Sequence, residues 1–164
     1  GGGVCRRHDH IRDAIHSWLE GLGHGSNTEQ FMPEWDDGDT RARLDVVTVN
    51  PRCGRLVVDV TLMDVVFPGA SVKAAKLLER CEKAKHKRYP GKGLYPFVLD
   101  TRGRWGREAR LFVRAVVSAL PDEQRISAIK QIRRKVAIAL HTRVAEQMPS
   151  AAGCPGAGSC TNAS

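Results

Sequence analysis

Two aspartates stand out as residues that could do chemistry, because they lie in apolar, β-branched runs where aspartate is disfavoured. Asp45 is in the run 44–50 (LDVVTVN), and Asp59 is in the run 55–62 (RLVVDVTL). Two carboxylates held close together repel each other unless a cation lies between them, and hard oxygen ligands favour Mg²⁺ or Mn²⁺. The alternative is structural: Asp45 would cap the start of its strand, and Asp59 would pair with a basic side chain.

The segment between the two runs determines whether the aspartates meet. Residues 51–54 (PRCG) are typical of a turn, so the two runs are predicted to form a β-hairpin. With a three-residue loop, Asn50 would pair with Gly54, and Asp45 would lie opposite Asp59 on one face of the sheet. A slip of one residue would separate the carboxylates, and the sequence leaves this open.

A basic helix is predicted to bring a lysine to the same face of the sheet. Residues 71–89 have helical periodicity, with one largely apolar stripe that turns basic toward its end. This stripe consists of Ala74, Leu78, Cys81, Lys85 and Arg88. Lys85 is therefore expected to point toward the sheet. A cation there suits phosphodiester hydrolysis, because it stabilises the charge that develops on the phosphate.

The other basic side of this helix is either a solvated surface or a surface that contacts phosphates. It consists of Lys73, Lys76, Arg80, Lys83 and Lys87. The sequence does not choose between these two interpretations. Three aromatic residues, Trp35, Tyr89 and Trp105, could stack on unpaired bases, although burial is the commoner role of such residues.

The remaining elements are predicted from periodicity and turn residues. They are a helix at 9–22, an acidic loop at 29–39, a strand at 94–99, a helix at 107–120 and a last helix after Pro121. Pro96 places the third strand at an edge or a bulge, and Ile126 is among the apolar residues at helical spacing in the last helix. The order α-β-β-α-β-α-α predicts an α/β fold in which helices flank a small mixed sheet.

Composition indicates one basic, globular domain. The chain has 164 residues, of which 41% are hydrophobic, and a formal net charge of +8. A basic balance favours a polyanionic partner, and nucleic acid is the commonest one, although anionic membranes and acidic proteins would also serve. No apolar run is long enough to span a bilayer, so we expect no membrane partner. The domain is predicted at 4–148, followed by a disordered tail rich in Ala, Gly, Ser and Cys at 149–164.

The two ends of the chain and its cysteines indicate the context of the domain. The sequence begins without an initiator Met, and we expect a domain of a longer protein. Five cysteines without a secretory signal indicate reduced thiols in the cytosol or nucleus. Cys5, His8 and His10 lack a fourth ligand for a structural zinc site, so polar residues at a helix start are the better explanation. The remaining histidines are scattered and suggest no catalytic pair.

These motifs resemble the restriction-like endonuclease domain of site-specific non-LTR retrotransposons, which belongs to the PD-(D/E)XK nuclease superfamily. The family motif is Arg/Lys-Pro-Asp, then twelve to fourteen residues, then Asp or Glu. Here Arg43-Leu44-Asp45 precedes Asp59 by thirteen intervening residues. The other similar segments are Arg7-His8-Asp9, Glu29 at an acidic position of the family, Lys85-His86-Lys87-Arg88-Tyr89 for Lys-x-x-Lys-Tyr, and Tyr95-Pro96-Phe97-Val98 with Gly103.

Three positions depart from the family pattern. Leu44 replaces a proline that serves conformation, and Arg88 replaces a lysine without the ability to carry a proton. Thr61 occupies the position at which a standard PD-(D/E)XK enzyme has its lysine. Lys85 would therefore be the catalytic lysine, as expected in a family whose lysine is displaced to the helix.

The resemblance implies a Mg²⁺- or Mn²⁺-dependent nuclear endonuclease that nicks target DNA and supplies the 3′-OH that primes reverse transcription. The rest of the reverse-transcriptase polyprotein would be its partner. The implied catalytic residues are Asp45, Asp59, Lys85 and Glu29, of which Asp45 and Asp59 would bind the metal. The implied nucleic-acid-binding residues are Arg43, Lys76, Arg80, Lys83, Lys87, Arg88 and Tyr89.

Two other functions stay open. One is a catalytically degenerate nuclease fold that binds DNA or RNA through its basic surface. The presence of Asp45, Asp59 and Lys85 together argues against it, because decay usually removes an acid first. The other is a basic interaction domain of a larger assembly, which remains if no DNA is bound.

Overall fold

The computed structural model describes residues 2–36, 41–64 and 71–146. The elements are α1 (Gly2–Gly21), β1 (Ser26–Phe31), the 3-10 helix η1 (Pro33–Trp35), β2 (Arg43–Asn50), β3 (Gly54–Met63), α2 (Ser71–Arg88), β4 (Leu94–Asp100), α3 (Arg107–Val117) and α4 (Asp122–Glu146). The tail predicted at 149–164 lies outside the described residues.

The strand β1 is the main difference from the predicted order, which placed an acidic loop after the first helix. Its sequence, SNTEQF, is polar and mostly exposed, so it has no apolar alternation by which a strand is detected. The strand forms through backbone pairing with β2, which places Thr28 opposite Val46 and Gln30 opposite Leu44. Tertiary pairing therefore determines this element where local sequence preference does not.

The four strands form one mixed sheet in the order β1-β2-β3-β4. The pairs β1–β2 and β2–β3 are antiparallel, and β3 and β4 are parallel. A parallel pair needs a crossover connection, and the segment that contains α2 provides it. β4 is an edge strand, as Pro96 predicts.

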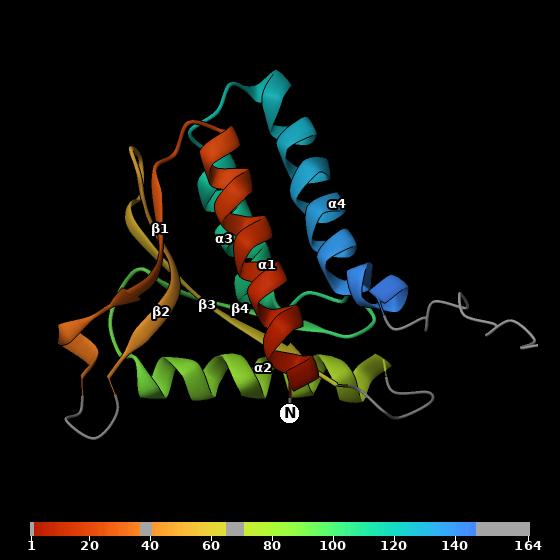
Figure 1. Ribbon diagram of the computed structural model, residues 1–164. Helices are drawn as coiled ribbons and strands as arrows, with labels where there is room; N and C mark the ends of the chain where they lie inside the picture. The colour runs from red at the N-terminus through yellow and green to blue at the C-terminus, as the bar shows by residue number, and fades with distance from the viewer. Residues whose placement is uncertain (1, 37–40, 65–70, 147–164) are drawn as a thin grey trace, which may run out of the picture.

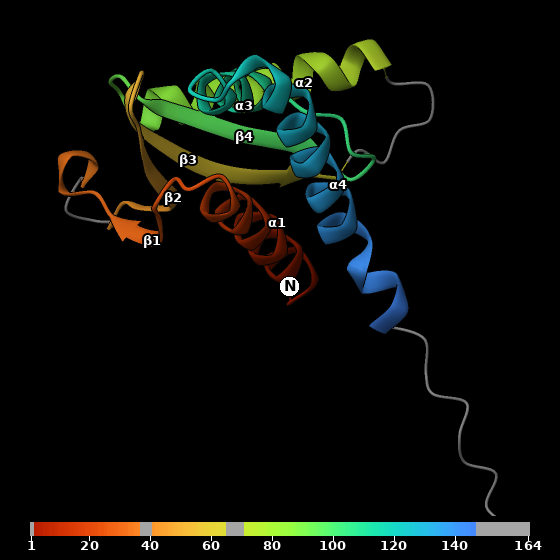
Figure 2. The ribbon, with the colours of Figure 1, turned by 90° about the horizontal axis from the view of Figure 1, so that it is seen from above.

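Helices cover both faces of the sheet, as predicted. Figure 1 shows α2 lying across the bottom of the sheet, whereas α1, α3 and α4 lie above it. Figure 2 shows α1 beside α4, and these two helices are in contact. Trp18 of α1, Phe97 of β4 and Phe112 of α3 are fully buried in the main core, with ring centroids 6.4 Å apart for Trp18–Phe112 and 6.2 Å apart for Phe97–Phe112. This core holds the three helices against the sheet.

The last helix buries part of the predicted stripe, because Val136 and Leu140 are buried and Ile129 is half-buried, but its first residue is not. Ile126 was expected to point inward, but it is 66% exposed. The residues that pack in the core are Ala128, Ile132, Val136, Ala139 and Leu140. Ile126 precedes Ala128 by two residues, which places it on the opposite side of the helix. No helix in the described part of the chain has the length and apolarity needed to cross a bilayer.

The turn of the β2–β3 hairpin is stabilised by one buried amide side chain. Asn50 Oδ1 accepts the backbone N–H groups of Arg52 and Cys53 at 2.8 and 3.1 Å. Asn50 pairs with Gly54, whose φ of 76° lies in the left-handed region that favours glycine. This turn sets the register of the two strands that carry the candidate catalytic aspartates.

Candidate active site

Asp45 and Asp59 lie on adjacent antiparallel strands at the buried end of the β2–β3 hairpin. The register pairs Val46 with Val58, and its next position places Asp45 opposite Asp59. Only 8% of Asp45 and 7% of Asp59 is exposed. The three-residue loop was the expected geometry, and the structure confirms it.

Lys85 reaches this pair from α2, the helix of the crossover between β3 and β4. Its Nζ atom lies 2.7 Å from Asp59 Oδ2, and 24% of its side chain is exposed. Ala74 and Leu78, on the same helical stripe, are buried. The stripe therefore faces the sheet as the periodicity predicts, and Lys85 extends it toward the carboxylates. Arg88, the last residue of the predicted stripe, is exposed.

The electrostatics of Asp59 reflect its burial. Removal from water raises the pKa of the Asp59 carboxyl above its ordinary value, and the positive charge and hydrogen bond of Lys85 act in the opposite direction. The negative charge of Asp45 raises this pKa further. Keeping Asp59 ionised in the folded protein therefore costs free energy, and a cation between the two carboxylates would offset that cost.

His8 of α1 is a site residue that sequence reasoning did not identify. Its Nε2 atom lies 3.2 Å from Asp45 Oδ2, which also accepts the backbone N–H of Val60 at 2.6 Å. The hydrogen bond with Asp45 raises the pKa of His8 from 6.5 to about 9, against the opposing effect of burial. The protonated imidazole therefore donates to Asp45 at neutral pH. The available signal was its place in Arg7-His8-Asp9, a segment similar to the start of the nuclease family.

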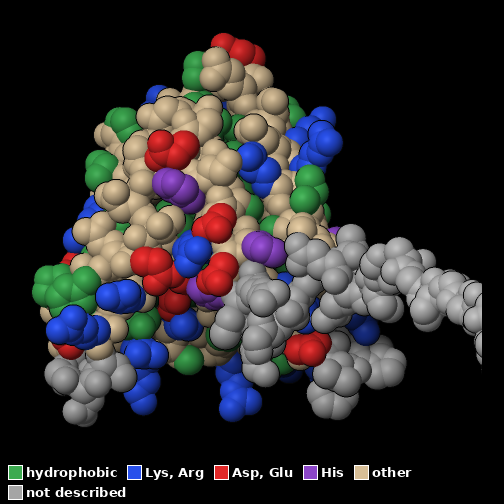
Figure 3. Space-filling view, viewed as in Figure 1, with side chains coloured by type: hydrophobic (Ala, Val, Ile, Leu, Met, Phe, Trp, Pro, Cys, Tyr) green, Lys and Arg blue, Asp and Glu red, His purple; other side chains and the backbone are tan. Residues whose placement is uncertain are grey.

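Glu29, the fourth predicted catalytic residue, forms an ion pair with Arg12 of α1. The β1–β2 register places it beside Asp45, but its φ of 54° interrupts the alternation of the strand. Its exposed carboxylate instead accepts a hydrogen bond from Arg12 Nη1 at 2.5 Å, and Arg12 also contacts Asp9 at 3.4 Å. Acidic and basic side chains gather over this part of α1 and β1 in Figure 3. Arg12 and Asp9 thus link Glu29 to His8 through a series of ion pairs.

Thr61 follows Asp59 by two residues on β3 and so lies on the same face. Its Oγ1 atom is buried. In the standard nuclease pattern this position holds the lysine. The cation in this chain is Lys85, which comes from a different element and reaches the same carboxylate.

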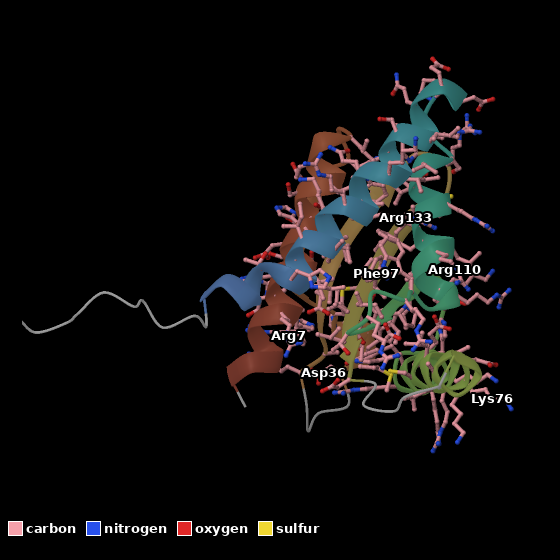
Figure 4. All side chains as sticks on the ribbon, turned by 90° about the vertical axis from the view of Figure 1, so that its right-hand side faces the viewer. Arg7, Asp36, Lys76, Phe97, Arg110 and Arg133 are labelled. Atoms are coloured by element: carbon pink, nitrogen blue, oxygen red, sulfur yellow. The ribbon has the colours of Figure 1, made fainter. Side chains whose placement is uncertain are left out.

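The predicted nucleic-acid-binding residues of α2 lie on its exposed side. Lys76, Arg80, Lys83 and Lys87 are all exposed, and Figure 4 shows Lys76 pointing away from the sheet. Lys83 forms an ion pair with Glu79 at 2.7 Å. Arg43, at the start of β2, is also exposed. The separation of Lys85 from this basic face agrees with the helical periodicity.

Tyr89 occupies the position predicted for stacking on a base, but its ring is buried. Only 5% of the residue is exposed, and the ring packs against Trp35 with centroids 5.6 Å apart. Arg88 lies over the same ring at 5.1 Å. Tyr89 is therefore a buried aromatic residue, which was the alternative to stacking on a base.

The donor atoms of Asp45 and Asp59 fit a hard divalent cation. Mg²⁺ keeps several waters and binds proteins through one or two carboxylates together with substrate phosphates, so two aspartates meet this requirement. The contacts of both residues described above involve Oδ2, so each carboxylate has a second oxygen that could contribute to binding a cation. Within the described ranges, no group of three or more His, Cys, Asp and Glu side chains is arranged to hold a metal by itself.

The comparisons with known proteins supply no family for this chain. No protein-family model matches the sequence, and no curated protein matches it significantly. The function is therefore argued from the residues and geometry of the site.

Proposed function

We propose that this domain is a metal-dependent DNA endonuclease that nicks one strand of its target. The observation that carries the proposal is the contact between Lys85 Nζ and Asp59 Oδ2, beside a second buried carboxylate, Asp45. Two carboxylates and one inward cation are the protein groups that metal-assisted phosphodiester hydrolysis needs.

Each residue of the site has a distinct role in this proposal. Asp45 and Asp59 would hold Mg²⁺ or Mn²⁺ between β2 and β3. When bound, the ion lowers the pKa of a water at the site and offsets negative charge on the phosphate. Lys85 would exchange its contact with Asp59 for one with a phosphate oxygen, where its ammonium group stabilises the charge of the transition state.

His8 is a positioning residue in this proposal. Its hydrogen bond to Asp45 Oδ2, together with the Val60 N–H, holds one oxygen of the carboxylate in place. The carboxylate of Asp45 would then be held ready to bind a cation. Fixing a ligand through contacts of this kind reduces the reorganisation needed when a metal binds.

The exposed basic side of α2 is the surface on which we place the DNA. Lys76, Arg80, Lys83 and Lys87 would contact phosphates, and Arg43 would do so at the start of β2. Lys85 projects from the same helix toward the carboxylates.

The biological setting rests on the resemblance of the ordered motifs to retrotransposon endonuclease domains. In that setting the nick supplies the 3′-OH for target-primed reverse transcription in the nucleus. The remainder of a reverse-transcriptase polyprotein would provide further DNA contacts. The observed mixed α/β sheet supports a restriction-endonuclease-like core, which is part of this proposal.

The experiment is nicking of supercoiled plasmid by the purified chain, with Mg²⁺ or Mn²⁺ titrated against a chelator. We expect open-circle product only with a divalent cation. The matched variants are Lys85→Ala and Lys83→Ala, which remove one charge from the inward and outward sides of α2. Nicking that survives complete chelation, or an equal decrease in the two variants, would reject the proposal.

One observation favours a second function, a non-catalytic module that binds nucleic acid. Lys85 and protonated His8 already neutralise Asp59 and Asp45, as they would in a purely structural cluster. Duplex DNA binding by the wild-type chain without nicking in Mg²⁺ or Mn²⁺ would establish this alternative.

A further inference from the structure

A second basic surface surrounds Trp105, in the loop between β4 and α3. Three hollows of about 410, 280 and 160 Å³ meet at this residue, and both Trp105 and Arg110 line all three. Arg107 lines the largest hollow, and Arg133 of α4 lines the other two. Figure 4 shows Arg110 on α3 and Arg133 on the neighbouring α4. We call this surface the Trp105 groove.

The loop that carries Trp105 is held in place by its own hydrogen bonds. Asp100 is fully buried, and its Oδ1 atom accepts the backbone N–H groups of Arg102 and Arg104 at 3.0 and 2.9 Å. Trp105 forms an isolated β-bridge with Leu99. Its ring packs on Phe97 with centroids 5.1 Å apart. The indole is therefore pre-organised, which reduces the entropy that a bound ligand would have to offset.

The arginines of the groove are arranged on one side of α3. Arg107, Arg110 and Arg114 follow the spacing i, i+3 and i+7, which is one helical face, and all are exposed. The guanidinium of Arg133 lies 6.0 Å from the centre of the Trp105 ring. In the part of the chain that the structure describes, none of these four arginines forms an ion pair.

The two carboxylates near the groove are already engaged. Glu79 and Glu82 line the largest hollow. Glu79 pairs with Lys83 at 2.7 Å, and Glu82 Oε1 accepts the backbone N–H of Glu108 at 2.9 Å. The groove therefore presents positive charge to a ligand, beside an aromatic ring.

We propose that the Trp105 groove binds single-stranded nucleic acid. Guanidinium groups bind phosphate through paired hydrogen bonds, and an aromatic ring or a guanidinium plane stacks on a base. Arginines beside one partly exposed tryptophan provide both contacts in one groove. An acidic protein would use the charge but not the ring. The bases of a duplex are stacked on one another and cannot pack on Trp105, so the single strand is the form that fits.

This inference does not rest on the proposed nuclease activity. Lys85 and Asp59 meet on the side of the sheet that α2 covers, whereas Arg110 and Arg133 belong to the helices of the opposite face. α2 also borders the largest hollow of the groove, but the arginines proposed to bind the ligand belong to α3 and α4. Each surface can therefore be removed by substitution while the other is kept.

The test is fluorescence anisotropy of the full chain with labelled oligo-dT, oligo-U and a duplex of equal length, over a series of salt concentrations. Arg110→Gln with Arg133→Gln should weaken single-strand binding at least ~10-fold and reduce its salt slope by about 1.4, or roughly 0.7 per phosphate. The matched control is Lys130→Gln with Arg134→Gln, which removes two charges of α4 outside the groove. Its binding should change less than ~3-fold.

A tryptophan variant separates stacking from charge. Trp105→Leu should weaken binding ~10-fold and leave the salt slope unchanged, because stacking releases no counterions. Trp105→Phe should recover most of the affinity, and thermal unfolding checks that both variants are folded. Lys85→Ala should keep full single-strand binding even if it abolishes nicking. The proposal is overturned if Arg110→Gln with Arg133→Gln weakens heparin or duplex binding as much as single-strand binding, or if the groove and control variants weaken single-strand binding equally.

Discussion

The ammonium group of Lys85 lies 2.7 Å from Asp59 Oδ2. A lysine of the crossover helix α2 thus forms an ion pair with a buried aspartate of β3. In the proposed reaction Lys85 has two successive partners, Asp59 and a phosphate of the DNA. It neutralises Asp59 before metal binds, and it is placed to meet a phosphate afterwards. Metal binding and Lys85 are therefore expected to compete for Asp59.

Lys85→Ala should lower the single-turnover nicking rate by about 10²-fold or more, because it removes a charge placed at the developing negative charge. Its affinity for duplex DNA should change little, since one side chain facing the sheet contributes little to phosphate binding. Lys83→Ala on the exposed side of α2 is the control and should keep the rate. A variant with weaker affinity at an unchanged rate would show that Lys85 is a phosphate contact only.

Asp59→Asn should abolish metal-dependent nicking and leave DNA binding nearly intact. Its thermal stability without metal should equal or exceed that of wild type. The pKa of Asp59 is raised by burial despite Lys85, so the stability that this group contributes is present below its ordinary value of 3.8 and disappears as pH rises through the raised value. Differential scanning calorimetry at neutral pH measures the effect. A large fall in melting temperature would mean that the ion pair with Lys85 outweighs the burial of Asp59.

The pH dependence of stability should report the contact between His8 and Asp45. The pKa of His8 is about 9 in the folded protein against 6.5 ordinarily, so its contribution is fully present below pH 6.5 and disappears as pH rises through about 9. Urea unfolding of metal-free wild type and His8→Gln should therefore show a stability difference that shrinks over this window. A difference that is constant with pH would indicate that His8 is neutral in the folded protein.

Lys76→Ala with Lys87→Ala should weaken duplex binding for every DNA sequence and lower the salt slope by about one for each phosphate that the variant no longer binds. The nicking rate at saturating enzyme should stay near that of wild type, because neither residue reaches the carboxylates. Binding isotherms over a salt series and single-turnover rates measure the two effects. An unchanged slope would identify this side of α2 as a solvated surface, the other interpretation of its charge.

Local sequence patterns determined much of the site. Alternation in the two β-rich runs placed Asp45 and Asp59 on one face, and the short turn at Asn50 set their register. Helical spacing placed Lys85 on the inward stripe of α2. These features depend on residues close in the sequence, where the periods of strand and helix apply directly.

Only the tertiary structure decided the contacts between distant segments. His8 contacts Asp45, which is 37 residues away in the sequence. Glu29, whose backbone is left-handed, pairs with Arg12. β1 forms because its backbone pairs with β2. Trp105 and Arg133 form a groove only because α4 packs beside α3. Such contacts depend on how whole elements pack, and the period of a single strand or helix carries no information about its neighbours.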